Sequence, residues 1–130
     1  MRAADTNVLA RLFALDDAGQ VAAAQRAIEA DSIFVPKTVM IELEWVLRNG
    51  YGQSKPMIVT VMAMIMTTEN VEVEDAATVE RALDWFRRGM DFADALHLAS
   101  SSHVEAFMTF DIAMRRRATA MGVRPSVAAP

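Results

Sequence analysis

The chain has 130 residues, which fits a single domain, and 53% of them are apolar, enough to bury a sizeable core. It contains no cysteine, which excludes disulfides and thiolate metal sites and favours a cytoplasmic location. The net charge of −4 is opposite to that of a simple phosphate-backbone binder. A cluster of site carboxylates that binds divalent ions would also make a protein acidic, so the charge leaves a nucleic-acid partner open. The first residues lack a secretory signal, and the most apolar stretch, residues 57–66, is too short to span a bilayer.

Predicted strands and helices alternate along the chain. Short apolar or β-branched runs predict strands at residues 2–5, 32–35, 71–73 and 107–110. Helical spacing and capping residues predict helices at residues 8–13, 18–30 with Asp17 as its cap, 36–49, a stretch that begins after Ser54, 75–88, 92–102 and 111–120. Residues 122–130 are weakly patterned, and we expect a tail that frays. This order predicts one domain over residues 1–130, a three-layer α/β/α sandwich with a central, mainly parallel sheet.

Two acidic residues follow predicted strands. In open parallel sheets, sites form beyond the carboxyl ends of the strands, which is where Asp5 and Asp111 fall. Each residue also begins a predicted helix, and taken alone each is explained more simply as a helix N-cap.

Glu42 lies within an apolar helix. It follows Val39 by three residues and precedes Val46 by four, so it shares a stripe with side chains that we expect to be buried. A carboxylate in such a stripe needs a partner or a metal ion, unless it lies at the rim of the helix. Glu44 is offset from this stripe and is interpreted as a solvated charge.

Asp91 and Asp94 open another helix and are three residues apart, so they face the same side of it. Asp91 is the better N-cap candidate. Asp94 lies in the first turn, where the helix dipole favours negative charge, and this effect alone is an alternative to a functional role. His97, one turn further on, is interpreted as an ordinary side chain rather than a metal ligand.

Four segments of the chain together resemble the PIN-domain nucleases of the VapC toxin type. They are Asp5-Thr6-Asn7-Val8-Leu9, then Phe34-Val35-Pro36 through Glu42 to Leu47, then Asp91-Phe92-Ala93-Asp94-Ala95-Leu96-His97-Leu98-Ala99, and Thr109-Phe110-Asp111. They occur in the order of the family and span nearly the whole chain. The first strand, Arg2-Ala3-Ala4, is less apolar than is usual in the family.

The resemblance implies an Mg²⁺- or Mn²⁺-dependent endoribonuclease, the toxin of a toxin–antitoxin pair. It also implies a cognate antitoxin protein as partner, and a homodimer. Carried onto this chain, the catalytic, metal-binding acids are Asp5, Glu42, Asp94 and Asp111, of which the last is the most variable in the family. The supporting polar groups are Thr6, Asn7, Asp91 and Thr109.

An all-carboxylate set without cysteine suits magnesium better than zinc, because magnesium prefers hard oxygen ligands. We expect metal-assisted, in-line attack of water on an RNA phosphodiester, with no nucleophilic side chain. Whether one or two ions take part is left open by the sequence.

Two further features bear on partners. Arg115, Arg116 and Arg117 follow Asp111 by one helical turn and are candidate RNA contacts together with Lys37, while Arg11, Arg87 and Arg88 add positive charge. The alternative is that these residues form ordinary solvated helix faces. Residues 57–66 are apolar almost all round, which predicts a dimer or antitoxin contact, or else internal packing.

Two other functions compete with the nuclease. A catalytically inert PIN-like binding module would use the same acids only as helix caps and act through protein–protein contacts. An aspartyl phosphotransferase with Asp5 as nucleophile is disfavoured, because Asn7 stands where that pattern requires a second aspartate. The RNA target, its cleavage sequence and the antitoxin do not follow from the sequence.

Overall fold

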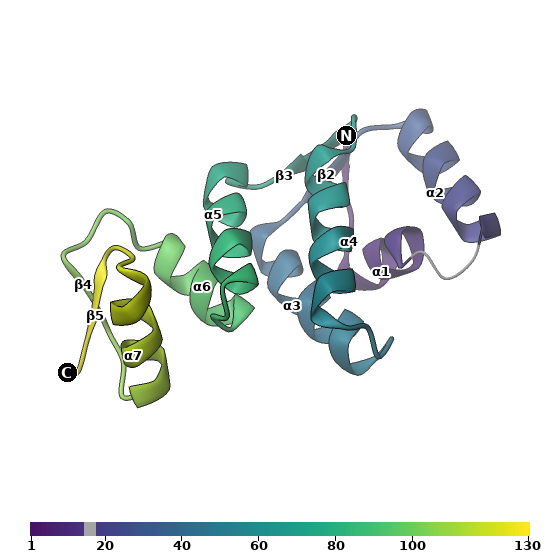
Figure 1. The fold of residues 1–130 in the computed structure, drawn as a ribbon. Helices are drawn as coiled ribbons and strands as arrows, with labels where there is room; N and C mark the ends of the chain where they lie inside the picture. The colour runs from purple at the N-terminus through teal and green to yellow at the C-terminus, as the bar shows by residue number, and fades with distance from the viewer. Residues whose placement is uncertain (15–17) are drawn as a thin grey trace. The chain divides into compact units, whose positions relative to one another are not determined.

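The computed structural model describes residues 1–14 and 18–130, so the predicted helix cap at Asp17 lies outside the described residues. The chain forms two compact units, Met1–Ala76 and Ala77–Pro130, each of which is considered by itself (Figure 1). In the described part of the chain, no helix is both long and apolar enough to cross a membrane.

Among its described residues, the first unit contains a parallel sheet of three of the four predicted strands, and the fourth pairs in a separate sheet. The three strands are β1 (Arg2–Ala3), β2 (Ile33–Val35) and β3 (Val71–Val73), in the spatial order β1-β2-β3. Ala3 pairs with Phe34, and Phe34 pairs with Glu72 on its other side. Strand β1 is shorter than the predicted 2–5, consistent with the low strand propensity of alanine.

In the described part of the first unit, four helices connect these strands. Helices α1 (Thr6–Phe13) and α2 (Ala18–Ala30) lie between β1 and β2, and α3 (Lys37–Asn49) and α4 (Lys55–Thr67) lie between β2 and β3. Helix α1 packs against α2 and α3, while α4 packs against α3 and β3. The buried face of α4 consists of Ile58, Val61, Met62 and Ile65. Internal packing therefore explains one face of the apolar stretch 57–66.

The two glutamates of α3 are placed opposite to the sequence prediction. The buried stripe is Met40, Leu43, Glu44 and Leu47, so Glu44 is 5% exposed and Glu42 is exposed. The interpretation of Glu44 as a solvated charge is wrong, and the alternative of a rim position describes Glu42. Each residue turns the helix by about 100°, so a stripe chosen one residue off exchanges the two faces. Arg48 compensates the buried charge, with Nε donating to Oε1 at 3.0 Å and Nη2 to Oε2 at 3.3 Å.

The second unit contains three helices and two strands. The helices are α5 (Ala76–Arg87), α6 (Phe92–Ala99) and α7 (Ile112–Met121), and the strands are β4 (Ala106–Met108) and β5 (Ser126–Ala128). The two strands pair in parallel, with Phe107 opposite Val127, and α7 packs against β5. The rings of Phe86 and Phe92 meet edge to face at 5.6 Å, which packs α5 against α6.

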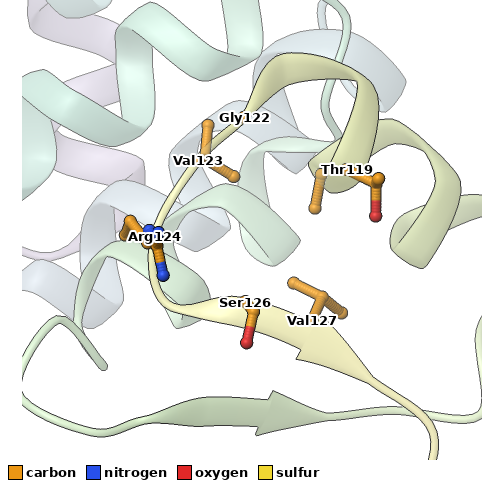
Figure 2. A pocket seen from close by; sticks show the side chains of 7 residues that line it. Thr119, Gly122, Val123, Arg124, Ser126 and Val127 are labelled. Carbon is orange, nitrogen blue, oxygen red and sulfur yellow. The ribbon is translucent and has the colours of Figure 1, made fainter.

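The end of the chain is ordered by pairing, contrary to the expectation of a frayed tail. Gly122 closes α7 in a left-handed conformation, with φ of 65°, which glycine adopts at little cost. Strand β5 follows, and Thr109 N donates to Ala128 O at 3.0 Å. Figure 2 shows the hollow of about 290 Å³ between the end of α7 and β5, lined by Thr119, Val123, Arg124, Ser126 and Val127 among others. The sequence gives β5 no pattern of its own, because its order comes from its partner β4.

Candidate active site

Asp5 lies where β1 ends and α1 begins. Its Oδ1 accepts a hydrogen bond from Val8 N at 3.0 Å, so it is the N-cap of α1. The side chain is exposed, and this capping bond uses one of its two carboxylate oxygens. Asp5 therefore combines a structural role with a carboxylate that solvent and ligands can reach.

The other predicted site residues of the first unit lie on α1 and α3, the helices that follow β1 and β2. Thr6 is 3% exposed, Asn7 is exposed, and Glu42 is exposed on α3. Lys37 begins α3 directly after β2, and its Nζ lies 3.3 Å from Asp75 Oδ2. Although α1 and α3 pack together, no interaction between the carboxylates of Asp5 and Glu42 occurs among the described contacts.

Asp91 and Asp94 meet at the start of α6. Asp91 is the N-cap, as predicted, and its Oδ2 accepts a hydrogen bond from Asp94 N at 3.1 Å. Asp94 lies in the first turn, where the unpaired N–H groups of the helix favour negative charge. Its side chain is half-buried, whereas Asp91 is exposed.

Asp111 begins α7 just after β4. Its Oδ1 accepts from Met114 N at 3.0 Å, so it caps this helix. Thr109 supports it from the strand side, because Thr109 Oγ1 accepts from Asp111 N at 3.0 Å. Arg115 Nη1 donates to Thr109 O at 3.3 Å and so fixes the same turn. Arg115 thus has a positioning role that its place in a run of three arginines did not reveal.

Three of these acids share one electrostatic environment. Burial raises the pKa of Asp94 above its ordinary value, and the negative charges of Asp91 and Asp111 raise it further. His97 acts in the opposite direction and lowers this pKa. Carboxylates that disfavour one another's ionisation are typical of sites at which a cation or a proton relieves the repulsion. Within the second unit, Asp91 and Asp111 therefore lie near enough to Asp94 for their charges to act on it.

The atoms that these side chains offer as ligands determine which metal ion they suit. Oxygen donors from carboxylates, in a chain without cysteine, suit Mg²⁺ or Mn²⁺ better than zinc. Within residues 1–14 and 18–130, no group of three or more acidic or histidine side chains is arranged to hold a metal ion. The residues thus fit a hard divalent ion by their chemistry, although a full set of protein ligands is not assembled among them.

Parallel strands joined by helices, with acids that cap the helices following the strands, define an α/β protein whose polar groups gather at strand ends. The family model of the PIN domain matches residues 3–120, and the chain belongs to the PIN domain family. The match extends into both compact units. Its α/β fold class, predicted from the alternation of strands and helices, is thereby confirmed.

One solved structure is similar to the chain along its whole length. It is the crystal structure of Mycobacterium tuberculosis VapC20, described as a sarcin–ricin loop cleaving toxin. The two sequences are 23% identical, the similarity covers 100% of each chain, and the TM-score is 0.42. None of the curated proteins compared with the chain matches it.

Proposed function

We propose that this PIN domain is an Mg²⁺- or Mn²⁺-dependent endoribonuclease that hydrolyses RNA phosphodiester bonds, and that it is the toxin of a toxin–antitoxin pair. The observation that carries the proposal is the group formed by Asp91, Asp94 and Asp111, in which burial, and then the neighbouring negative charges, raise the pKa of Asp94. A divalent cation bound beside these carboxylates would neutralise their mutual repulsion, and strongly perturbed carboxylates of this kind are typical of functional sites.

Each acid has a proposed role. Asp5, Glu42, Asp94 and Asp111 are ligands of the ion, directly or through water. Asp91 and Thr109 are positioning residues, since they hold the backbone N–H groups of Asp94 and Asp111 respectively. Thr6 and Asn7 support Asp5 at the start of α1. A bound divalent ion supplies a nucleophilic water near neutral pH and positive charge for the leaving oxygen.

The proposed protein partners are a second copy of the chain and an antitoxin, with α4 as a contact surface. Met57 on this helix is exposed, and Val59, Met64 and Met66 are half-buried, so apolar surface remains beyond its packed face. Flexible, polarisable methionine side chains adapt well to protein partners.

Cleavage of RNA by the purified chain tests the nuclease. The parent should cut RNA with Mg²⁺ and stop when EDTA is added, and Asp94→Asn should lower the rate at least about 10²-fold. Glu105→Gln, which also removes one exposed carboxylate from the second unit, should cut like the parent. Unchanged cleavage in both Asp94→Asn and Asp5→Asn would contradict the proposed site.

The two roles of Asp5 can be separated by substitution. Asparagine caps helices about as well as aspartate, so Asp5→Asn should keep the stability of the fold and lose cleavage. Asp5→Ala should lose cleavage and, in addition, about 1 kcal/mol of the free energy of unfolding. Equal stability of the two variants would show that the cap at α1 contributes nothing.

The inert binding module is the other outcome of these measurements. Such a protein would cut no RNA and would show no rise in melting temperature with Mg²⁺ or Mn²⁺.

A further inference from the structure

Three arginines border a hollow on the second unit. It has a volume of about 570 Å³ and is lined by Arg88, Ala113, Arg116, Arg117, Ala120 and Met121. We call it the arginine hollow. Ala113 and Ala120 of α7 are among the lining residues, and their small side chains fill little of the hollow.

Arg88 is held between the end of α5 and the end of α7. Its Nη2 donates to Met121 O at 3.4 Å, and its Nη1 lies 3.7 Å from Asp84 Oδ2. Both side chains of this ion pair are about half exposed or more, so the pair only weakly offsets the charge of the guanidinium.

Arg117 occupies space that a side chain on Gly89 would fill. A Cβ at Gly89 would collide with Arg117 Nη1, and the φ of 111° at Gly89 is itself one that favours glycine. Gly89 closes α5, with its N–H donating to Phe86 O at 3.0 Å. The turn after α5 thus makes room for Arg117 beside Arg88, and Arg116 on the same helix is exposed.

Arg115 does not belong to this group. Its guanidinium is bonded to Thr109 O and it does not line the hollow. Lys37 lies in the first unit, where its Nζ is paired with Asp75. Of the basic residues singled out from the sequence, Arg88, Arg116 and Arg117 are the ones that line the hollow.

The charge of the chain is distributed unevenly, in a way that favours an anionic ligand here. Residues 1–76 contain eleven acidic and six basic residues, whereas residues 77–130 contain six acidic residues and seven arginines. The whole net negative charge thus resides in the first unit, and three of the seven arginines of the second gather at one hollow.

We propose that the arginine hollow binds the phosphodiester backbone of the RNA substrate, an inference that rests on the proposed nuclease function. Guanidinium groups match phosphate oxygens with two parallel hydrogen bonds and remain weakly hydrated, which suits a backbone contact. The contact is independent of base sequence, because phosphates carry no sequence information. It also gives an acidic protein a local site at which to retain RNA.

Binding of a fluorescein-labelled single-stranded RNA in EDTA, followed by anisotropy over a range of KCl, tests the proposal without cleavage. Arg88→Gln, Arg116→Gln and Arg117→Gln together should raise Kd at low salt at least about 10-fold and reduce the slope of log Kd against log [KCl] by about 2. The matched control is Arg81→Gln, Arg87→Gln and Arg124→Gln, which removes the same charge from exposed positions of the same unit. The control should change the slope less than half as much.

Two further variants guard against an effect on folding. Arg116→Glu reverses one exposed charge and should weaken binding more than Arg87→Glu does. Gly89→Ala should displace the guanidinium of Arg117 and weaken binding in the same direction, with circular dichroism used to verify that each variant is folded.

Equal effects of the two triple variants, or none in either, would overturn the proposal. A second result would also overturn it: the parent binds labelled poly-glutamate but not RNA, and the hollow variant no longer binds poly-glutamate. The hollow would then bind an acidic protein. Cleavage is scored separately with Mg²⁺. A parent that binds RNA through the hollow but does not cut it would leave this inference standing and refute only the nuclease.

Discussion

Asp94 is held with its carboxylate half-buried beside two other acids, Asp91 and Asp111. Its pKa in the folded protein is therefore raised above the ordinary 3.8. A raised pKa means that the folded state binds the proton more tightly than the unfolded state does. The stabilisation that this proton provides is complete below about pH 3.8 and is lost as the pH rises through the folded pKa. At neutral pH, the ionised Asp94 thus lowers the stability of the metal-free protein.

Replacing Asp94 should therefore stabilise the fold in the absence of metal. In EDTA at pH 7, Asp94→Asn should melt about 1–3 °C above the parent, because a partly buried charge and its repulsion by Asp91 and Asp111 are removed. The difference should shrink as the pH is lowered toward 4, where the parent carboxyl takes up its proton. Thermal melts at several pH values measure both effects, and Glu105→Gln is the control. A variant that is less stable than the parent at pH 7 would contradict the electrostatic description of this site.

Glu44 was misjudged from the sequence because a helix stripe is defined only to within one residue by a few apolar side chains. Val39 and Val46 are apolar but only half-buried, while Met40, Leu43 and Leu47 form the buried face. The same periodicity argument did place the acids at helix starts. Asp5, Asp91 and Asp111 are all N-caps, because capping depends on local sequence and not on which face is buried.

At the scale of the element, α3 depends on the pair between Glu44 and Arg48. Arg48→Ala would leave the carboxylate of Glu44 buried without this partner, and we expect a loss of about 1–3 kcal/mol in the free energy of unfolding by urea titration. Glu42→Gln, on the exposed side of α3, should change it by less than about 0.5 kcal/mol. Glu44→Met combined with Arg48→Met should recover part of the loss, since it removes both charges. If Arg48→Ala leaves the free energy of unfolding unchanged, solvent must reach the carboxylate of Glu44.

Strand β5 gives a second prediction at this scale. A chain that ends at Gly122 lacks β5 and leaves the pairing edge of β4 uncovered, so its melting temperature should fall by several degrees. A chain that ends at Ala128 keeps the pairing and the bond from Thr109 N, and should melt like the parent. Equal melting of the two truncated chains would restore the view of residues 122–130 as a dispensable tail.

Much of the element order could be read from the sequence, whereas β5 could not. The strands at 32–35 and 71–73 and the helices between them follow from short apolar runs and helical periodicity. Ser126, Val127 and Ala128 have no such pattern, and they form a strand only because β4 offers a parallel partner. Pairing between segments far apart in sequence is not encoded in either segment alone.

At the scale of the whole molecule, four short segments were enough to identify the PIN family, which matches residues 3–120. The cluster of Asp91, Asp94 and Asp111 within the second unit could be expected from these segments and from the rule that sites follow parallel strands. The basic residues Arg88, Arg116 and Arg117 could be singled out in the same way, but the hollow that they share could not. It depends on a glycine turn and on the ends of two helices, which bring Arg88 to Arg116 and Arg117.

The proposed homodimer is tested on the intact chain by multi-angle light scattering. The parent should have the mass of a dimer, and Met64→Glu should give a monomer, because it places a charge on the half-buried apolar surface of α4. Met108→Glu, a change at an exposed methionine of the second unit, should remain dimeric. A monomeric parent at high concentration would contradict the dimer, and dissociation by Met108→Glu alone would place the contact elsewhere.

The turn at Gly89 has a consequence for the history of this sequence. An ancestor with glycine at position 89 tolerates many residues at position 117, because glycine occupies no space there. A Cβ at position 89 would meet the guanidinium of Arg117, so an arginine at position 117 keeps the position it has here only beside glycine. Among homologues, arginine at position 117 should therefore occur with glycine at position 89, while glycine at position 89 should occur with many partners. If homologues show this pattern, glycine at position 89 was acquired before arginine at position 117.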